Sequence, residues 1–349
     1  MEPEYALQLL KSASGEVQSL AVGTTFTEIS TARLGAVPIP VPPLDEQAVI
    51  VRFLSHANRE LRRYIRAKQT LIKLLEEQKR AIIHRVVTRG LNPAARLKSS
   101  GIEWLGQTPD HWAVVSFSRV AIERADYRGA TPEKTDSGVF LVTAKNVRRG
   151  WIDYEVSQEY VAEREYETVM RRGLPRMDDL LLTMEAPLGN AALVDRERIA
   201  LAQRVIRFRF DPRVLEPRFV LVSVLAPYFQ NQLLCRGTGS TALGIKASKL
   251  PQLQLLMPPL DEQRLILRHI DAESIPLDSA SARANSEIAL LRELRTRLVA
   301  DVVTGKLDVR EAAARLPDSV KDREPLEDID FEIDSDDEVD RVDAVAEEA

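Results

Sequence analysis

The side chains with the clearest chemical potential in this 349-residue chain are basic and amide groups beside glycines. One cluster comprises Lys145, Asn146, Arg148 and Arg149, and a glycine follows it. A strand end followed by a turn of this kind can offer hydrogen-bond donors to phosphates and to base edges. The cluster therefore favours a nucleic-acid contact, although taken singly it could equally be an ordinary solvated basic surface.

Two further groups of residues offer the same chemistry. Gln203 and Arg204 lie just before an apolar run, and either side-chain type can contact a base edge through two hydrogen bonds. Thr238 and Ser240 lie in a glycine-rich segment, and Lys246 follows it. Each group alone could be solvated surface, but together in one region of the chain they indicate DNA as the partner.

The patterns of catalytic and metal sites are missing from the sequence. There is one cysteine, the four histidines are scattered, and neither HExxH nor a Cys/His cluster occurs. The glycine-rich segment departs from a phosphate-binding loop because Gly244 is followed by Ile245 instead of Lys-Ser/Thr. We therefore expect no catalytic residue, no metal ligand and no cofactor bound by this chain.

An internal repeat organises the elements around these groups. The segment Pro-Pro-Leu-Asp-Glu-Gln occurs at residues 42–47 and again at residues 258–263, an offset of 216 residues. The same offset carries Val86-Val87-Thr88 onto Val302-Val303-Thr304, so residues 23–91 and 239–307 align without a gap. The period is far longer than that of a solenoid. The chain therefore reads as a duplicated unit, each copy consisting of a globular part and a long helix.

A long helix is predicted after each Pro-Pro-Leu-Asp-Glu-Gln segment. Asp45 is a plausible N-cap, and Arg89-Gly90 with Pro93 ends the first helix. Apolar residues recur at steps of mostly three and four, as in a coiled coil, and a straight helix from Glu46 to Thr88 would be roughly 60–65 Å long. Pro276 predicts a kink or a break in the second helix. The residues expected to pack the two helices together are Ile50, Leu54, Leu61, Leu71, Leu75, Ile82, Ile266, Ile270, Leu291 and Leu298.

The region between the helices is different in character, because short β-rich runs alternate with turn signals. Val139–Val142 and Leu180–Leu182 are examples, and Phe219–Leu234 should include a helix. We predict an α+β fold, in which a mixed α/β domain joins two long helices packed as an antiparallel coiled coil. The expected boundaries are residues 1–41, 42–95, 96–257, 258–312 and 313–349, the last a disordered acidic tail.

The net charge of −5 is the sum of two segments of opposite charge. Residues 321–349 hold 14 acidic and three basic residues, so this tail carries −11 and residues 1–320 carry +6. A mildly basic body permits a nucleic-acid partner without requiring one. No apolar run is long enough to span a membrane, and the single cysteine fits a reducing cytoplasm. We expect a cytoplasmic protein with no membrane partner.

These segments resemble the specificity subunit of type I restriction–modification enzymes over about residues 3–316. The start of a target recognition domain is matched by Gly101–Gly106 and Pro109–Trp112, and the spacer helix by the repeated hexapeptide and the later Val-Val-Thr. The sequence departs from the family at its beginning, where the first recognition domain is reduced to residues 1–41. Further matches are Thr143–Val147, Gly150–Ile152, Leu181–Thr183 with Gly189, and Gly237–Thr241.

The resemblance implies a division of labour within a complex. This chain would read one half of a bipartite double-stranded DNA target without catalysing a reaction, and its helices would set the distance between the halves. Two methyltransferase subunits would dock on it and carry S-adenosylmethionine. Motor–nuclease (restriction) subunits would use ATP and Mg²⁺. The remnant at residues 1–41 implies an N-terminally truncated member, with Pro3, Tyr5 and Leu7 matching Pro217, Phe219 and Leu221.

An alternative from another class also fits the sequence. The long helices could form the coiled coil of a structural or adaptor protein without DNA specificity, and the basic groups would then be incidental. Co-purification of a methyltransferase and retention of DNA distinguish the first interpretation from the second.

Overall fold

The computed structural model describes residues 1–20, 29–102, 104–127, 132–239 and 243–317. Two compact units make up the chain. The first unit combines Met1–Tyr64 with Leu290–Ala349, and the second unit is Ile65–Ala289. The predicted acidic tail beyond residue 317 and Ser240 both lie outside the described residues.

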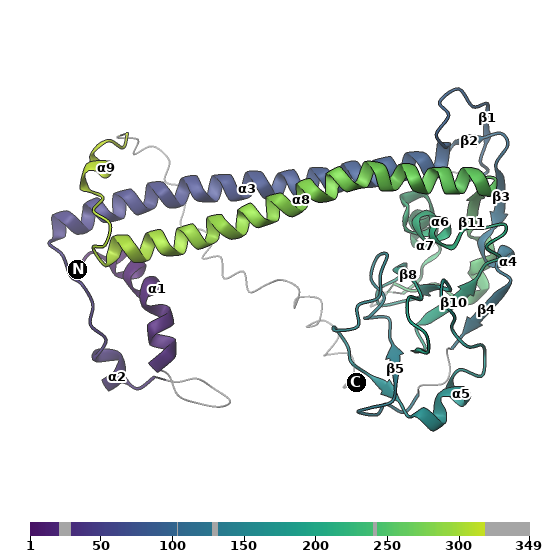
Figure 1. Ribbon diagram of the computed structural model, residues 1–349, viewed down its shortest axis with the longest axis horizontal. Helices are drawn as coiled ribbons and strands as arrows, with labels where there is room; N and C mark the ends of the chain where they lie inside the picture. Colours follow the sequence, from purple (N-terminus) through teal and green to yellow (C-terminus); the bar gives the residue numbers. More distant parts are fainter. Residues whose placement is uncertain (21–28, 103, 128–131, 240–242, 318–349) are drawn as a thin grey trace. The chain divides into compact units, whose positions relative to one another are not determined.

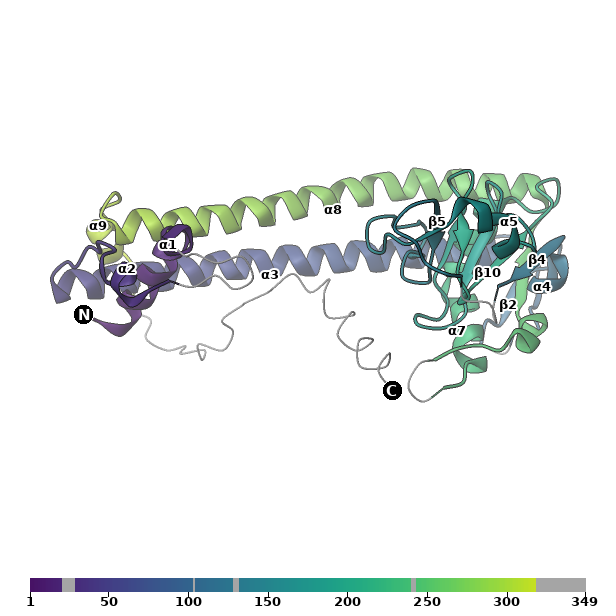
Figure 2. The ribbon, with the colours of Figure 1, turned by 90° about the horizontal axis from the view of Figure 1, so that it is seen from below.

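Two long helices correspond to the two copies of the repeat. Helix α3 is Leu44–Arg89, with 46 residues, and helix α8 is Leu260–Val303, with 44 residues. Each begins directly after two prolines and has an aspartate and a glutamate in its first turn, where the helix dipole favours negative charge. Figures 1 and 2 show each as one long helix. Gly90 follows α3 with φ +70°, the left-handed conformation that commonly ends a helix.

Two details of these helices differ from the sequence predictions. Because α3 already begins at Leu44, Asp45 lies inside the first turn and is not the N-cap. Helix α8 continues through Pro276, so the break considered there is wrong. Pro276 is exposed, so water can satisfy the carbonyl group that loses its helical partner.

The two helices run antiparallel in each unit. In the first unit, Nε of Arg295 in α8 donates to Oδ1 of Asn58 in α3 over 3.1 Å. In the second unit, Lys68 pairs with Glu287 at 2.5 Å and Lys79 with Asp278 at 2.8 Å. Residue numbers fall along α8 as they rise along α3, as the antiparallel prediction requires.

The predicted packing residues fall into three groups by burial. Ile50, Leu54, Ile266 and Ile270 are buried, and Leu61, Leu75, Ile82, Leu291 and Leu298 are half-buried. Leu71 is 40% exposed, so the predicted packing role is wrong for this residue. At 100° per residue its neighbour Ile72 faces the seam instead, and Ile72 is half-buried.

An antiparallel sheet forms the centre of the second unit. Its four strands lie in the order β4-β10-β7-β8. Their side chains alternate between two cores: Leu182 and Phe208 enter one cluster, and Leu181 and Val205 enter another on the opposite face. The strands are β4 Glu123–Asp126, β7 Leu180–Thr183, β8 Ala191–Leu193 and β10 Val205–Arg209.

Smaller elements cover both faces of this sheet. A three-stranded sheet of order β6-β5-β9 contributes to one core, and the pair β11-β3 contributes to the other. The strands are β1 Leu97–Ser99, β2 Gln107–Pro109, β3 Ala113–Ser116, β5 Val139–Val142, β6 Tyr160–Val161, β9 Ala200–Leu201 and β11 Gln254–Met257. The helices are α4 Phe117–Val120, η1 Glu163–Glu165, α5 Tyr166–Val169, α6 Pro217–Leu225, α7 Pro227–Arg236 and η2 Ala247–Gln252.

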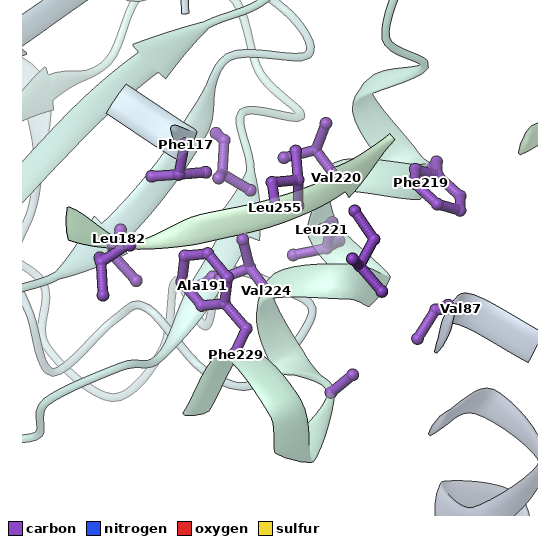
Figure 3. Packing of buried hydrophobic residues seen from close by; sticks show 14 of the residues in the cluster. Val87, Phe117, Leu182, Ala191, Phe219, Val220, Leu221, Val224, Phe229 and Leu255 are labelled. Carbon is purple, nitrogen blue, oxygen red and sulfur yellow. The ribbon is translucent and has the colours of Figure 1, made fainter. Parts of the chain in front are cut away.

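The larger core joins the sheet to the long helices within the second unit. It includes Val86 and Val87 at the end of α3 and Ile266 near the start of α8. Figure 3 shows Val87 together with Phe219 and Val220 of α6 and Leu255 of β11. The long helices are therefore anchored in the globular part by apolar side chains from α6 and β11.

A buried ion network lies on the other face of the sheet. Arg207 of β10 and Asp179 are each 1% exposed, and Nη1 of Arg207 donates to Oδ2 of Asp179 over 3.0 Å. Arg209 also donates to Asp179, over 2.7 Å from Nε, and Glu123 of β4 accepts from both arginines. Removing one partner from such a network leaves a buried charge without its counter-charge, which lowers the free energy of unfolding by about 3–5 kcal/mol.

The first unit is smaller and is built around the other ends of α3 and α8. It also contains α1 Pro3–Leu20, α2 Thr31–Gly35 and α9 Arg310–Ala314. Tyr5 and Leu9 of α1 pack with Ile50 and Leu54 of α3 and with valines at the end of α8. The predicted α+β fold with two long antiparallel helices is confirmed, and the five domain boundaries stay predictions.

Candidate nucleic-acid interface

The loop between β7 and β8, residues 184–190, holds the predicted groups together. The backbone N–H of Met184 donates to the carbonyl of Arg204 over 2.9 Å, and the N–H of Ile245 donates to the carbonyl of Met184 over 2.9 Å. Nδ2 of Asn190 donates to the carbonyl of Val147 over 2.9 Å. Segments that are up to 100 residues apart in sequence therefore meet at this one loop.

Asn146 holds the first cluster in shape. Its side chain is fully buried, and Oδ1 accepts hydrogen bonds from the N–H of Thr143 at 2.8 Å and from Oγ1 of Thr143 at 2.7 Å. Nδ2 donates to the carbonyls of Asp153 at 2.8 Å and Ser157 at 2.9 Å. All four hydrogen-bonding positions of the amide are thus occupied. The structure gives Asn146 a supporting role in place of the predicted DNA contact.

The cations of this cluster differ in their surroundings. Lys145 is exposed, whereas Arg148 is half-buried with Nε 3.5 Å from Oδ2 of Asp153. Nη2 of Arg149 donates to the carbonyl of Leu225 over 3.1 Å. Burial and the nearby Arg80 guanidinium lower the pKa of the Arg149 guanidinium below its ordinary value. Lys145 and Arg149 are both exposed, but the Arg149 guanidinium is held to a backbone carbonyl.

The second and third groups lie on either side of the β7–β8 loop. Gln203 is half-buried and Arg204 is exposed, with its Nε 3.4 Å from Oε1 of Glu185. Thr238 is exposed and exchanges backbone hydrogen bonds with Gly244, at 2.8 and 3.0 Å. Lys246 is also exposed.

The structure therefore brings the three predicted groups together and adds members that were not predicted. Glu185 pairs with Arg204, and Gln230 of α7 donates from Nε2 to the carbonyl of Gly189 over 2.9 Å. Gly189 has φ +88°, in the left-handed region that favours glycine over any residue with a Cβ. The glycine beside Leu181–Thr183 was the sequence signal for this loop.

Exposed donors arranged in this way suit a negatively charged ligand. Lys145, Arg204 and Lys246 come from three separate segments of the second unit, so a flat polyanion could meet several of them at once. Across the described ranges, His, Cys, Asp and Glu side chains do not gather in threes in positions to hold a metal ion. Among those same residues, no helix is long and apolar enough to cross a membrane.

Comparison with protein families identifies a Type I restriction modification DNA specificity domain at residues 2–72. This range covers α1 and the first part of α3.

Curated relatives and a solved structure match most of the chain. The MjaVIII specificity subunit of Methanocaldococcus jannaschii is 22% identical over 321 residues, which cover 89% of this chain and 71% of that protein. The EcoKI specificity subunit of Escherichia coli is 21% identical and matches over 84% of this chain and 62% of its own length. A chain from a solved structure of type I R-M complex assembly has a TM-score of 0.63 at 18% identity, covering 88% of this chain and 72% of that one.

Proposed function

This chain is a relative of type I restriction–modification specificity subunits, as the sequence resemblance predicted, and we propose that it is the DNA-recognition subunit of such a system. The observation that carries the proposal is the meeting of three donor-bearing segments at the β7–β8 loop. Lys145 and Lys246 would contact phosphates, and Gln203 and Arg204 would contact base edges, because these side-chain types suit those partners. Arg148, Arg149 and Thr238 would contribute further donors.

The second unit would read one half of a bipartite target. Residues 96–257 would form its target recognition domain, and helices α3 and α8 would set the distance to the other half. Residues 1–41 would correspond to the distal end of a first recognition domain. In support of this, α1 begins at Pro3 and α6 begins at Pro217, and each places a fully buried aromatic ring two residues later.

The chain would position other subunits and would not catalyse the reaction. Two methyltransferase subunits carrying S-adenosylmethionine would dock on the two similar copies of the repeat. Restriction subunits would supply the ATP- and Mg²⁺-dependent translocation and cleavage. The repeat supports this arrangement because equivalent surfaces can receive equivalent partners.

A binding selection tests the proposal. The full chain, alone and with the methyltransferase subunit of its own system, is mixed with duplexes of random sequence, and the retained DNA is sequenced. We expect enrichment of a split motif in the complex, and Gln203→Ala with Arg204→Ala should relax preference at particular positions, each base pair being worth about 1–3 kcal/mol.

A matched control tests the assignment of the residues. Lys145→Ala with Arg148→Ala should weaken binding to all sequences and reduce its salt dependence, whereas Arg283→Ala with Lys306→Ala removes equal charge elsewhere. Absence of any enriched motif, in the complex as in the chain alone, would contradict the proposed function.

A further inference from the structure

Helix α3 carries a row of basic residues that the predicted interface does not include. Seven residues make nearly two helical turns, so residues at this spacing share one face of a helix, drifting by about 20° per repeat. Five basic residues occur at this spacing in α3: Arg52, Arg59, Arg66, Lys73 and Arg80. We call these five residues the basic row.

The basic row lies on the side of α3 that faces solvent. Arg66, Lys73 and Arg80 are exposed, whereas Leu54 and Val86, which lie about 120° away around the helix at 100° per residue, are buried. The described ion pairs between the long helices use other residues, Lys68 and Lys79. Within the part of the chain that the structure describes, Arg66, Lys73 and Arg80 have no carboxylate partner.

Helix α8 has no such row, although it is the second copy of the same repeat. At the offset of 216 residues, the positions of Arg66, Lys73 and Arg80 are occupied by Ala282, Ala289 and Thr296. Helix α3 holds 11 basic and five acidic residues, and α8 holds six basic and eight acidic ones. Packing of an antiparallel helix pair therefore does not require the row.

One end of the row reaches the candidate interface within the second unit. Arg80 is close enough to Arg149 for the two positive charges to interact. Arg149 itself is bound to the carbonyl of Leu225 and lies in the turn that the β7–β8 loop holds. Two nearby guanidinium groups repel each other, and a bound anion would relieve that repulsion.

We propose that Arg66, Lys73 and Arg80 bind backbone phosphates of the duplex next to the bases read by the second unit. This inference rests on the proposed function and extends the DNA contact along α3. The three cations are spaced at about 10.5 Å along the helix, and a duplex presents one charge per roughly 1.7 Å, so each cation can find a phosphate. Such contacts would add affinity without adding sequence preference.

A salt titration with matched variants tests this proposal. The full chain binds a fluorescent duplex of random sequence, and the dissociation constant is measured between 50 and 200 mM salt for the wild type and for Arg66→Gln/Lys73→Gln/Arg80→Gln. Three lost phosphate contacts lower the salt slope by about 2.7, so the fall in affinity over this range becomes roughly 40-fold smaller. The control, Arg283→Gln/Arg297→Gln/Lys306→Gln, removes equal charge from α8 and the turn after it and should keep the wild-type slope.

The outcomes separate this proposal from the proposed function. The proposed role of the row would be overturned if the α3 variant kept the wild-type salt dependence of DNA affinity. It would also be overturned if the α8 control lowered that salt dependence by the same amount. If the α3 variant loses affinity but the selected motif is unchanged, both proposals stand. If no motif is selected by any form of the chain while the α3 variant still loses affinity, the row binds DNA but the recognition function fails. If the triple variant folds poorly, the same salt titration is made with Lys73→Glu, a single change at an exposed position, and its slope is interpreted in the same way.

Discussion

The two copies of the repeated hexapeptide are fixed by the same hydrogen bonds in two different settings. In the second unit, Oε1 of Gln263 accepts from the N–H of Glu216 over 2.9 Å, and its Nε2 donates to the carbonyl of Pro258 over 2.8 Å. In the first unit, Oε1 of Gln47 accepts from the N–H of Glu2 over 2.8 Å, and its Nε2 donates to the carbonyl of Pro42 over 2.7 Å. Both glutamines are buried. The final residue of the hexapeptide is thus a structural requirement of each copy.

The surroundings of these two glutamines differ greatly. In the second unit, Val220 and Val224 of α6 are completely buried in the large core. In the first unit, Leu7 and Leu10 of α1 are 42% and 60% exposed. The same local bonds therefore occur once inside a full domain and once in a small cluster, and fewer buried contacts mean lower local stability. The hexapeptide therefore fixes the start of a helix, whereas the size of the surrounding core determines how stable that start is.

The largest expected effect comes from removing the buried aromatic side chain near the hexapeptide glutamine of each copy, Phe219 in the second unit and Tyr5 in the first. Phe219→Ala should lower the free energy of unfolding of the second unit by about 3–5 kcal/mol, because the ring is fully buried among large side chains. Tyr5→Ala should open only the first unit, leaving amide exchange in β10 unchanged. Hydrogen exchange measured by mass spectrometry localises both effects.

The control for this pair is Tyr5→Phe, which removes only the hydroxyl that donates to the carbonyls of Pro40 at 3.1 Å and Val303 at 3.2 Å. It should cost about 1 kcal/mol. Equal loss of protection in β10 for the Tyr5→Ala and Phe219→Ala variants would contradict the view that the two settings differ in stability.

An intermediate effect is expected for the glutamines themselves. Gln263→Ala leaves the N–H of Glu216 and the carbonyls of Pro258 and Val214 without their partner, which costs about 1–3 kcal/mol. Gln47→Ala should cost less, because it leaves two backbone groups without their partner, the N–H of Glu2 and the carbonyl of Pro42, instead of three. Chemical denaturation of the two variants, with Gln254→Ala as a half-buried control, measures the order. A larger loss for Gln47→Ala would reverse the comparison.

The smallest effect concerns an ion pair that only the second unit has. Arg218 of α6 forms hydrogen bonds with Asp271 of α8, while the equivalent residues of the first unit are Glu4 and Ser55. The hydrogen bond from Arg218 lowers the pKa of the Asp271 carboxyl. Its stabilisation is therefore present above the unfolded-state pKa of about 3.9 and is lost as the pH falls through the lower folded-state value.

Because this pair is exposed, it should contribute no more than about 1 kcal/mol. Asp271→Asn should remove that contribution at neutral pH and flatten the acid limb of the stability curve of the second unit. Ser55→Ala, at the matching position of the first unit, should change neither. An unchanged acid limb in the Asp271→Asn variant would show that the pair does not contribute.

Much of the architecture follows from periodicity and the repeat. The step of three and four residues after each Pro-Pro predicted α3 and α8, and the apolar runs at Val139–Val142 and Leu180–Leu182 coincide with β5 and β7. The exposure and the partners of individual side chains could not be predicted from the periodicity. Leu71 fits the stepwise pattern, but the true helical angle turns it to solvent. Arg207 lies in an apolar strand, and only the fold brings Asp179 and Glu123 to it.

The candidate interface was predictable as a set of segments but not as individual contacts. Residue type alone marked Asn146 as a donor to bases, whereas four internal hydrogen bonds bury it. The pairing of Arg204 with Glu185 and the closeness of Arg80 to Arg149 depend on segments far apart in sequence. Such neighbours become visible only when the strands are assembled.

The buried amide of Asn146 has a practical consequence for redesign. Because its four hydrogen bonds hold the turn from inside, we expect exchanges of the side chains next to it to disturb the backbone less than a change of Asn146 itself. Under the proposed function, a library aimed at a new DNA target should keep position 146 constant and vary positions 145, 148, 203, 204 and 246. Members carrying a changed residue 146 should be recovered mainly as insoluble protein.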